Sequence, residues 1–318
     1  MQPDRERIEH LSVETGFRIN ALEKVIRLTD ILNDIFKHPF LSDAFVLKGG
    51  TALNLFFGPP SRLSVDLDFN YIGSTDRKEM LNNRNRVENT VTSICESSGY
   101  LVQKSAYAHA GRKFYLRFEN IDGTRDRIEV DINYLHRQLL LPYCTRSAWT
   151  SDSSQNCSGK LISIEELCAG KICACFDRTS PRDIYDVVRL PIIAGQKWNS
   201  SVMRSIIIAY TGLLPKPVSD YSMDTVMRRV TREHFLKTLI PMLLVDDHPE
   251  FDSLKSETWE ILEAFTVLNN DEQEFVNSLQ KGELLPELLF PDSKRLQELM
   301  RTHPPLLWKV QNAREHFR

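Results

Sequence analysis

Two carboxylates placed two residues apart are the side chains of this chain best suited to chemistry. Asp66 and Asp68 stand in a run of alternating polar and apolar residues that predicts a strand. Because strand side chains alternate between faces, both carboxylates project from the same face. Carboxylates held so close repel each other unless a cation lies between them. Mg²⁺ prefers oxygen ligands and keeps positions open for phosphates. The pattern therefore predicts magnesium-assisted chemistry on a phosphorylated substrate.

The residues before this strand are suited to binding that substrate. A short apolar run leads into Lys48-Gly49-Gly50-Thr51, and the next six residues predict one or two turns of helix. A glycine turn exposes backbone N–H groups and allows a close approach, which suits a triphosphate. Lys48 is placed either to contact phosphate or to end the strand. Two residues nearer the carboxylates, Arg62 and Ser64, are expected to bind the nucleotide or to position the metal loop.

A third carboxylate comes from a second alternating run, residues 127–133. Glu129, Asp131 and Asn133 share one face of the predicted strand, and apolar residues occupy the other. If this strand lies one strand along from Asp66 and Asp68, Asp131 completes a three-carboxylate metal site, with Glu129 as the weaker candidate. The alternative is the solvated outer face of an edge strand.

The segment 163–186 holds the next candidates. Ser163 followed by Glu166 predicts a capping box and the start of a helix. Lys171 lies in the middle of an apolar stripe of that helix, where an unpaired ammonium is costly, so we expect it to meet an anion such as a triphosphate. A second helix starts at Pro181. The structural alternative for that helix is an ion pair between Arg182 and Asp186.

These residues resemble known nucleotidyltransferases. The glycine turn followed by Asp-x-Asp resembles motif I of the polymerase β-like superfamily. The wording LKGGTALNLFFG…RLSVDLDF resembles the AbiEii/AbiGii-type (MenT-like) toxins of bacterial toxin–antitoxin pairs, whose second signature resembles the K-x₆-R-x₃-R-D-x-x-D pattern starting at Lys171. The resemblance implies an α+β fold, with a nucleotidyltransferase core of mixed sheet and flanking helices at residues 1–158 and a mainly helical C-terminal domain at 159–318.

The resemblance also implies roles for individual residues. The implied metal ligands are Asp66, Asp68 and Asp131, and the implied catalytic set adds Lys171 and Asp186, with Asp183 as the rival of Asp186. The implied nucleotide-binding residues are Lys48, Gly49, Gly50, Thr51, Arg62, Ser64, Lys171, Arg182 and Asp183.

The implied activity is transfer of a nucleoside monophosphate from an NTP, with Mg²⁺ and release of pyrophosphate. The implied acceptor is the 3′ end of tRNA, whose modification would block aminoacylation and translation, as expected of an abortive-infection toxin with a cognate antitoxin partner. Two alternatives remain open from the residues. One is a nucleotidyltransferase acting on a small molecule or a protein, and the other is a non-catalytic nucleotide-binding module.

Composition limits the setting. The 318 residues are 42% hydrophobic and 26% charged, which is typical of a globular protein. No apolar run reaches 18 residues and the start is charged, so we expect no membrane span and no signal peptide. Six cysteines without C-x-x-C spacing indicate reduced thiols and a cytoplasmic protein. The net charge of −3 means that any RNA-binding surface is local.

Basic residues cluster at three places: Arg77-Lys78 with Arg84 and Arg86, Arg228-Arg229 with Arg232, and Lys309 to Arg318. Each is a candidate RNA contact or an ordinary charged helix face. Aromatic–basic interleaving of the kind seen in single-strand readers is not expected.

Periodicity predicts the elements that hold these residues. Residues 15–38 and 76–98 carry helical patterns, and a strand–turn–helix–strand unit spans 44–72. Strands are expected at 100–107, 113–119 and 126–135. The polar, serine-rich stretch 147–159 is expected to be a loop or domain boundary, and the chain beyond 160 to be almost entirely helical.

Overall fold

The computed structural model describes residues 4–151 and 156–316, and the chain divides into two compact units. Unit 1 comprises the chain up to Arg137, Tyr143–Ile162 and Pro241–His248. Unit 2 comprises Gln138–Pro142, Ser163–Ile240 and the chain from Pro249 onward. Each unit is described separately.

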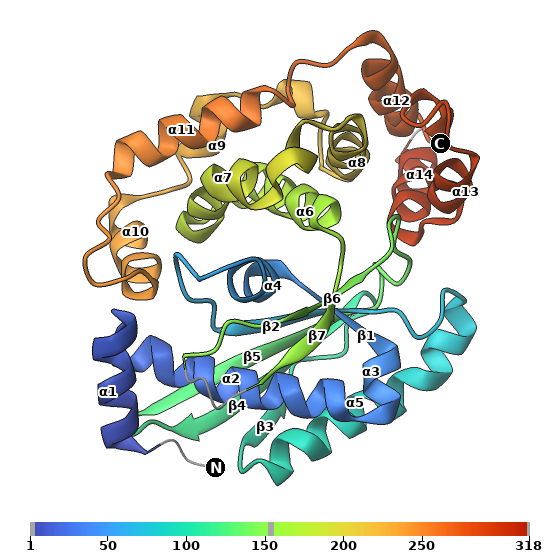
Figure 1. Cartoon of the computed structure of the whole chain (residues 1–318). Coiled ribbons are helices and arrows are strands. Elements are labelled where there is room, and N and C mark those ends of the chain that lie inside the picture. Colours follow the sequence, from blue (N-terminus) through green and yellow to red (C-terminus); the bar gives the residue numbers. More distant parts are fainter. Residues whose placement is uncertain (1–3, 152–155, 317–318) are drawn as a thin grey trace. The chain divides into compact units, whose positions relative to one another are not determined.

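Unit 1 is built on a seven-stranded mixed sheet with the strand order β3-β4-β5-β2-β1-β7-β6 (Figure 1). Strand β2 pairs parallel to β5 and antiparallel to β1. Strand β5 also pairs antiparallel to β4, so it is a central strand. This confirms the expected mixed sheet, with β5 next to the strand that carries Asp66 and Asp68. The strands are β1 (Phe45–Lys48), β2 (Asp66–Tyr71), β3 (Leu101–Lys104), β4 (Gly111–Glu119), β5 (Arg125–Asn133), β6 (Cys144–Ser147) and β7 (Ser158–Leu161).

Helices cover the two faces of the sheet unequally. On the apolar face, α2 and α5 pack over buried residues such as Phe69 and Val130 (Figure 1). The ring of Phe36 on α2 meets Phe69 edge-on at 6.0 Å. Helix α4 lies on the opposite, polar face, against β1 and β2. The helices of unit 1 are α1 (Arg5–Thr15), α2 (Ile19–Lys37), α3 (Pro39–Ala44), α4 (Gly49–Phe56) and α5 (Arg77–Ser97).

The stretch 147–159 is only partly the loop that its composition predicts. Its two ends belong to β6 and β7, which pair antiparallel from Cys144↔Leu161 to Ser147↔Ser158. Residues 152–155 lie outside the described part of the chain. The prediction is wrong at the ends because short strands at the sheet margin are half-exposed and need no apolar alternation.

A segment far along the chain returns to unit 1. Leu243 forms a bridge with Arg62, and Leu244 forms one with Phe17. The Leu63 N–H also donates to the Met242 carbonyl at 2.8 Å. The loop between α4 and β2 is thus fixed by backbone contacts with residues about 180 positions further along the chain, and no local pattern in the sequence predicts these contacts.

Unit 2 is helical, as expected beyond residue 160. Among the described residues, no helix is long and apolar enough to cross a membrane. The α-helices are α6 (Ile164–Asp177), α7 (Pro181–Ala194), α8 (Ser201–Thr211), α9 (Met223–Met227), α10 (Arg232–Thr238), α11 (Phe251–Glu263), α12 (Asn270–Gln280), α13 (Lys294–Thr302) and α14 (Pro304–His316). Short 3₁₀ turns lie at Gly195–Asn199, Val218–Asp220 and Pro286–Leu288, and a fourth, Ile240–Met242, lies where the chain passes into unit 1.

Candidate active site

Four charged residues form a row across the polar face of the unit 1 sheet. Strand register places Lys48 opposite Asp68, Asp68 opposite Asp131, and Asp131 opposite Lys113. Residues directly opposite one another project from the same face. The register therefore brings together Asp68 and Asp131, which are 63 residues apart, and places a lysine at each end of the pair. Asp66 lies in the next row, opposite Glu129.

Gly49 leaves the space that the Asp68 side chain occupies. Its φ is +74°, and a Cβ built on it would lie 2.2 Å from Asp68 Oδ2. Only glycine adopts this backbone conformation without strain, and any larger residue would also displace the carboxylate. Gly50 also leaves no room for a side chain, since a Cβ there would lie 2.8 Å from Ser64 Oγ. The glycine pair is needed to seat the start of α4 beside Asp68.

The carboxylates of this row influence one another. Burial and the neighbouring Asp68 raise the pKa of Asp131, and Lys113 and Lys48 offset only part of that effect. The Lys113 ammonium lies 3.8 Å from Asp131 and 3.5 Å from Glu129. Burial lowers the pKa of Lys113, but these two carboxylates outweigh it and leave the pKa raised. The site thus holds excess negative charge that the two lysines balance only in part.

Lys113 is the residue that sequence reasoning missed here. It lies on β4, and only the β4–β5 register places it beside Asp131. The available signal was the alternation of residues 111–119, which puts Lys113 on the polar face.

The predicted magnesium ligands are not gathered as a set of three. Within residues 4–151 and 156–316, no three His, Cys, Asp or Glu side chains are grouped so that they could hold a metal ion. The register pairs Asp68 with Asp131 and sets Asp66 one row away. The three-carboxylate site therefore stays a prediction.

Three predicted nucleotide-binding residues support the site from within the protein. The Thr51 hydroxyl donates to the Asp66 carbonyl and lies 3.1 Å from the Ser64 hydroxyl. The Arg62 guanidinium donates to the Leu63 carbonyl at 2.9 Å. All three side chains are buried, with Arg62 only 2% exposed. These contacts favour the positioning role for Arg62 and Ser64, because they hold the loop leading into β2.

In unit 2, Lys171 already has anionic partners. Its Nζ lies 2.6 Å from Asp186 Oδ2 and 3.6 Å from Asp183 Oδ1, and all three side chains are buried. The lysine is therefore paired with carboxylates rather than isolated on an apolar stripe. The anion that the sequence requires is supplied by α7. The roles of Lys171, Arg182, Asp183 and Asp186 toward a nucleotide stay predictions.

Asp183 also caps α7. Its carboxylate and the Ser180 hydroxyl form a reciprocal capping box, and the Arg178 guanidinium donates to it at 3.0 Å. Burial alone would raise the pKa of Asp183, but Lys171, Arg178 and Ser180 outweigh burial and hold the pKa well below its usual range. Asp183 is thus held by three residues, Lys171, Arg178 and Ser180.

The predicted capping box at the start of α6 forms only by half. The Ser163 hydroxyl accepts the Glu166 N–H at 3.1 Å, as expected. The Glu166 carboxylate instead accepts from the N–H groups of Leu140 and Leu141 and from the Tyr210 hydroxyl. Burial raises the pKa of Glu166 in spite of these bonds. A long-range contact has replaced the local one.

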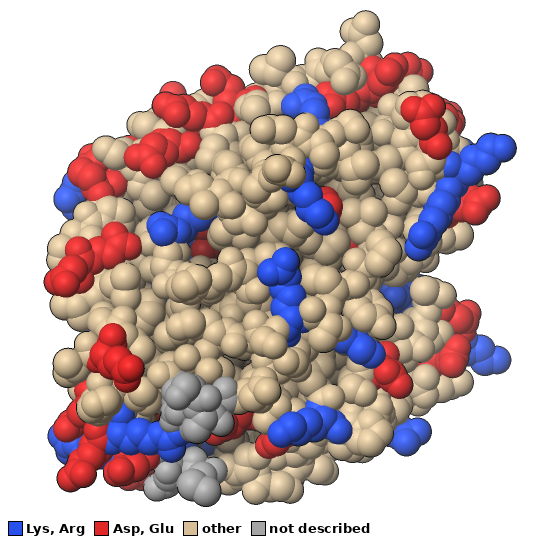
Figure 2. Space-filling view, viewed as in Figure 1, with Lys and Arg blue, Asp and Glu red and all other residues tan. Residues whose placement is uncertain are grey.

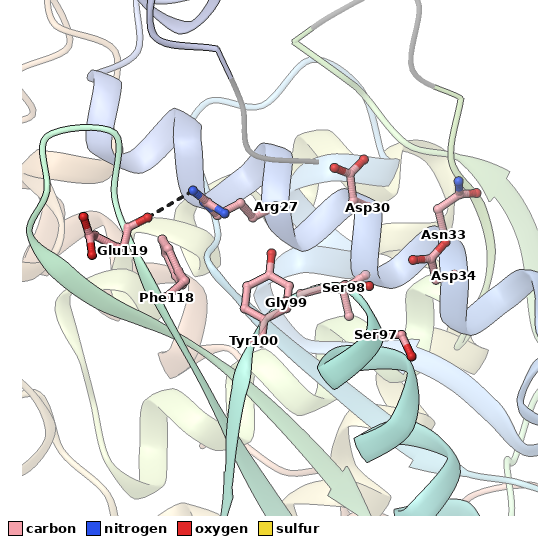
Figure 3. Close-up of a pocket in the computed structure, with 11 residues that line it drawn as sticks. Arg27, Asp30, Asn33, Asp34, Ser97, Ser98, Gly99, Tyr100, Phe118 and Glu119 are labelled. Carbon is pink, nitrogen blue, oxygen red and sulfur yellow. Dashed lines mark hydrogen bonds between the residues drawn. The ribbon is translucent and has the colours of Figure 1, made fainter.

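A separate hollow of about 630 Å³ lies between α2, the end of α5 and the end of β4 (Figure 3). Asp30 and Asp34 line it from α2, with Tyr100 and Phe118 opposite. None of the predicted site residues lines this hollow, and we assign it no part in nucleotide transfer.

The comparisons with known proteins decide the family. The model of the family "Nucleotidyl transferase AbiEii toxin, Type IV TA system" matches residues 30–256, which is most of the chain and includes every predicted site residue. The chain belongs to this family. It is therefore a nucleotidyltransferase toxin of the type found in type IV toxin–antitoxin systems.

A solved nucleotidyltransferase toxin shares the fold. The chain is similar to MenT4, a nucleotidyltransferase toxin from Mycobacterium tuberculosis H37Rv, with 16% identity, a TM-score of 0.56, and coverage of 94% of this chain and 98% of that one. A putative nucleotidyltransferase from H. pylori shares 18% identity at a TM-score of 0.48, with 78% of this chain and 95% of that one covered. No curated protein is similar enough in sequence to match.

Proposed function

We propose that this AbiEii-family toxin transfers a nucleoside monophosphate from an NTP to the 3′ end of tRNA and so blocks aminoacylation. The observation that carries the chemical part is the pair Asp68–Asp131, set in register on adjacent strands, with Gly49 leaving room for the Asp68 carboxylate. Such a pair on a polar sheet face is suited to phosphoryl chemistry and serves no evident structural purpose.

The donor set fits magnesium. Asp66, Asp68 and Asp131 offer only oxygen ligands, Asp68 and Asp131 lie in register on adjacent strands, and the neighbouring Asp68 contributes to the raised pKa of Asp131. We propose these three residues as the magnesium ligands, with substrate phosphates completing the coordination. Magnesium, when bound there, would neutralise charge on the phosphates and on the leaving pyrophosphate.

The proposed step is an in-line displacement. The acceptor 3′ oxygen forms a bond to the α-phosphorus, the bond from that phosphorus to the bridging oxygen breaks, and pyrophosphate leaves. Asp131, which lies in register beside Asp68, accepts the hydroxyl proton. Lys48 and the N–H groups at the start of α4 offer positive charge to the phosphates.

For unit 2 we propose that Lys171 contacts a nucleotide phosphate and that Asp186 holds the lysine ready for it. The support is the 2.6 Å ion pair, which holds the ammonium in a buried place. The proposal would be contradicted by a Lys171→Met protein that remains folded and that binds NTP and transfers nucleotide like the unmodified protein.

The test is a labelling assay. Purified protein is incubated with Mg²⁺, total RNA and each α-³²P-labelled NTP in turn. We expect label in a band of tRNA size with at least one nucleotide, and none after the RNA 3′ ends are oxidised or magnesium is chelated. Asp68→Ala should label nothing, and Asp43→Ala, which changes an exposed carboxylate of unit 1, should label normally.

Each failure has its own meaning. Label on the toxin itself or on another protein would favour a protein acceptor. Label on no macromolecule, with pyrophosphate still released when small-molecule extracts are added, would favour a small acceptor. Growth arrest on expression should depend on Asp68, and toxicity that survives Asp68→Ala would refute the chemical mechanism.

A further inference from the structure

One side chain of each basic cluster that the sequence offers as an RNA contact is engaged by other groups of the protein. Arg84 is 2% exposed, bonds Glu88 at 2.8 Å and stacks between the rings of Tyr107 and Tyr134. Arg229 donates to backbone carbonyls of residues 176 and 177, and Lys309 to that of residue 214. On the face shown in Figure 2, Lys and Arg side chains are interspersed with Asp and Glu.

Strands β4 and β5 carry a basic group that the linear sequence conceals. Lys113, Tyr115 and Arg117 alternate along β4 and so share the polar face with Asp131. The register sets Arg127 of β5 opposite Arg117. The expectation that no aromatic–basic interleaving occurs is therefore wrong, because the interleaving follows the strand period of two along β4, and pairing with β5 adds Arg127.

Two arginines directly opposite each other are unusual for a purely structural sheet. Like charges in this position destabilise a strand pair, and sheets ordinarily place opposite charges there. Arg117 is satisfied by Gln103 at 2.7 Å, and Arg127 by Glu129 at 2.9 Å. Both side chains remain exposed, Arg127 by 58%. Arg117 and Arg127 can therefore exchange their side-chain partners for an anion without any change in the surrounding structure.

The aromatic residue adds a stacking surface. The Arg127 guanidinium lies over the Tyr115 ring, 5.0 Å from its centroid. Stacked guanidinium and aromatic groups are what sequence-tolerant single-strand binders offer to bases, while arginines bind the phosphates. Tyr115 also lies opposite Glu129, one row from Asp131. The stacking surface is thus adjacent to the catalytic carboxylates.

The far end of this face is hollowed and held in place. An open hollow of about 800 Å³ is lined by Leu101, Arg117, Glu119, Arg125 and Arg127, among others. From the other side of the sheet, Arg27 donates to the Glu119 carbonyl at 3.2 Å and stacks on Phe118 at 4.5 Å (Figure 3). The end of β4 is therefore fixed, so binding there requires no ordering of the backbone.

We propose that this face, defined by Lys113, Tyr115, Arg117, Arg125 and Arg127 and named here the β4–β5 basic face, binds the phosphodiester backbone of the single-stranded 3′ end of the acceptor RNA. The proposal rests on the proposed function. Arg127 is four residues along β5 from Asp131, or about 13 Å at strand spacing. A few nucleotides of extended strand span that distance, so phosphates upstream of the reacting 3′ hydroxyl lie over the arginines.

The test compares two double variants of the full chain that lose the same charge. Arg117→Ala/Arg127→Ala removes the centre of the basic face. Arg5→Ala/Arg301→Ala removes two exposed arginines that pair with Glu9 and Glu287 on helices elsewhere. Binding of a fluorescein-labelled twelve-nucleotide single-stranded RNA is measured by anisotropy over a range of KCl concentrations. KM values for RNA and NTP are measured separately.

For the basic-face variant we expect the slope of log K against log salt to become shallower by about 0.7 per lost contact. The RNA KM should rise about tenfold, with the NTP KM and the unfolding midpoint unchanged. The control should match the unmodified protein, and Arg117→Lys/Arg127→Lys should keep the salt slope. A basic-face variant that binds RNA like the control would overturn the assignment and leave the proposed function standing. Unmodified protein that does not bind RNA would also overturn it. Salt-dependent binding lost only in the basic-face variant, without transfer to RNA, would support the surface and refute the proposed function.

Discussion

Gly49→Ala is the most direct test of how the site is built. The substitution introduces two separate effects. An alanine at a φ of +74° is strained by roughly 1–2 kcal/mol. Its Cβ would also lie 2.2 Å from Asp68 Oδ2, whereas ordinary contacts begin near 3.4 Å, so the carboxylate must retreat by about 1 Å.

The two effects have different readouts. Strain lowers the free energy of unfolding, which urea titration measures. Displacement of a catalytic group by about 1 Å lowers the transfer rate by about a hundredfold. We therefore expect Gly49→Ala to fold with a loss of roughly 1–2 kcal/mol and to label RNA about a hundredfold more slowly.

Gly16→Ala is the matched control. Gly16 has a φ of +75°, and a Cβ there would meet only Leu244 at an ordinary 3.5 Å. It should lose similar stability and keep full activity. If Gly49→Ala is folded and transfers nucleotide within threefold of the Gly16→Ala protein, the Asp68 carboxylate does not need the position that the glycine provides, and the reasoning is refuted.

Three further predictions concern the charged groups. In Lys171→Met, two buried carboxylates lose their ammonium partner, so the free energy of unfolding measured in urea should fall by about 3–5 kcal/mol. The exposed Lys237→Met should lose less than about 1 kcal/mol, and an undiminished midpoint in Lys171→Met would contradict the pairing. Because the pKa of Asp131 is raised, its ionised form disfavours folding. Without metal, Asp131→Asn should therefore unfold at a higher temperature than the unmodified protein at pH 7, and the difference in unfolding temperature should vanish below about pH 4. A difference that grows in acid would contradict this direction of the pKa shift. Because the pKa of Asp183 is lowered, its contribution to stability is present above about pH 4 and is lost as the pH falls. The Asp183→Asn protein should therefore lose less stability on acidification than the unmodified protein, and parallel pH–stability curves would contradict the contacts assigned to Asp183.

Local sequence determined much of unit 1 and of the chemistry. Alternation with a period of two placed Asp66 with Asp68, and Glu129 with Asp131, on the same faces of their strands, because strand geometry fixes side-chain direction regardless of context. The glycine pair marked the turn beside them for a similar reason, since only glycine fits a positive φ against a neighbouring carboxylate. The helical pattern beyond residue 160 was equally local, and the motifs together pointed to the family.

Tertiary structure decided which local groups meet. Strand order made β5 the neighbour of β2, and register then placed Asp131 beside Asp68, Lys113 beside Asp131, and Arg117 opposite Arg127. Long-range contacts drew Glu166 away from its local cap and gave Lys171 its partners on the next helix. Which strands or helices pair with one another depends on the total apolar surface that the whole folded unit buries. A single segment specifies which face its side chains occupy, and only the folded chain specifies what that face meets.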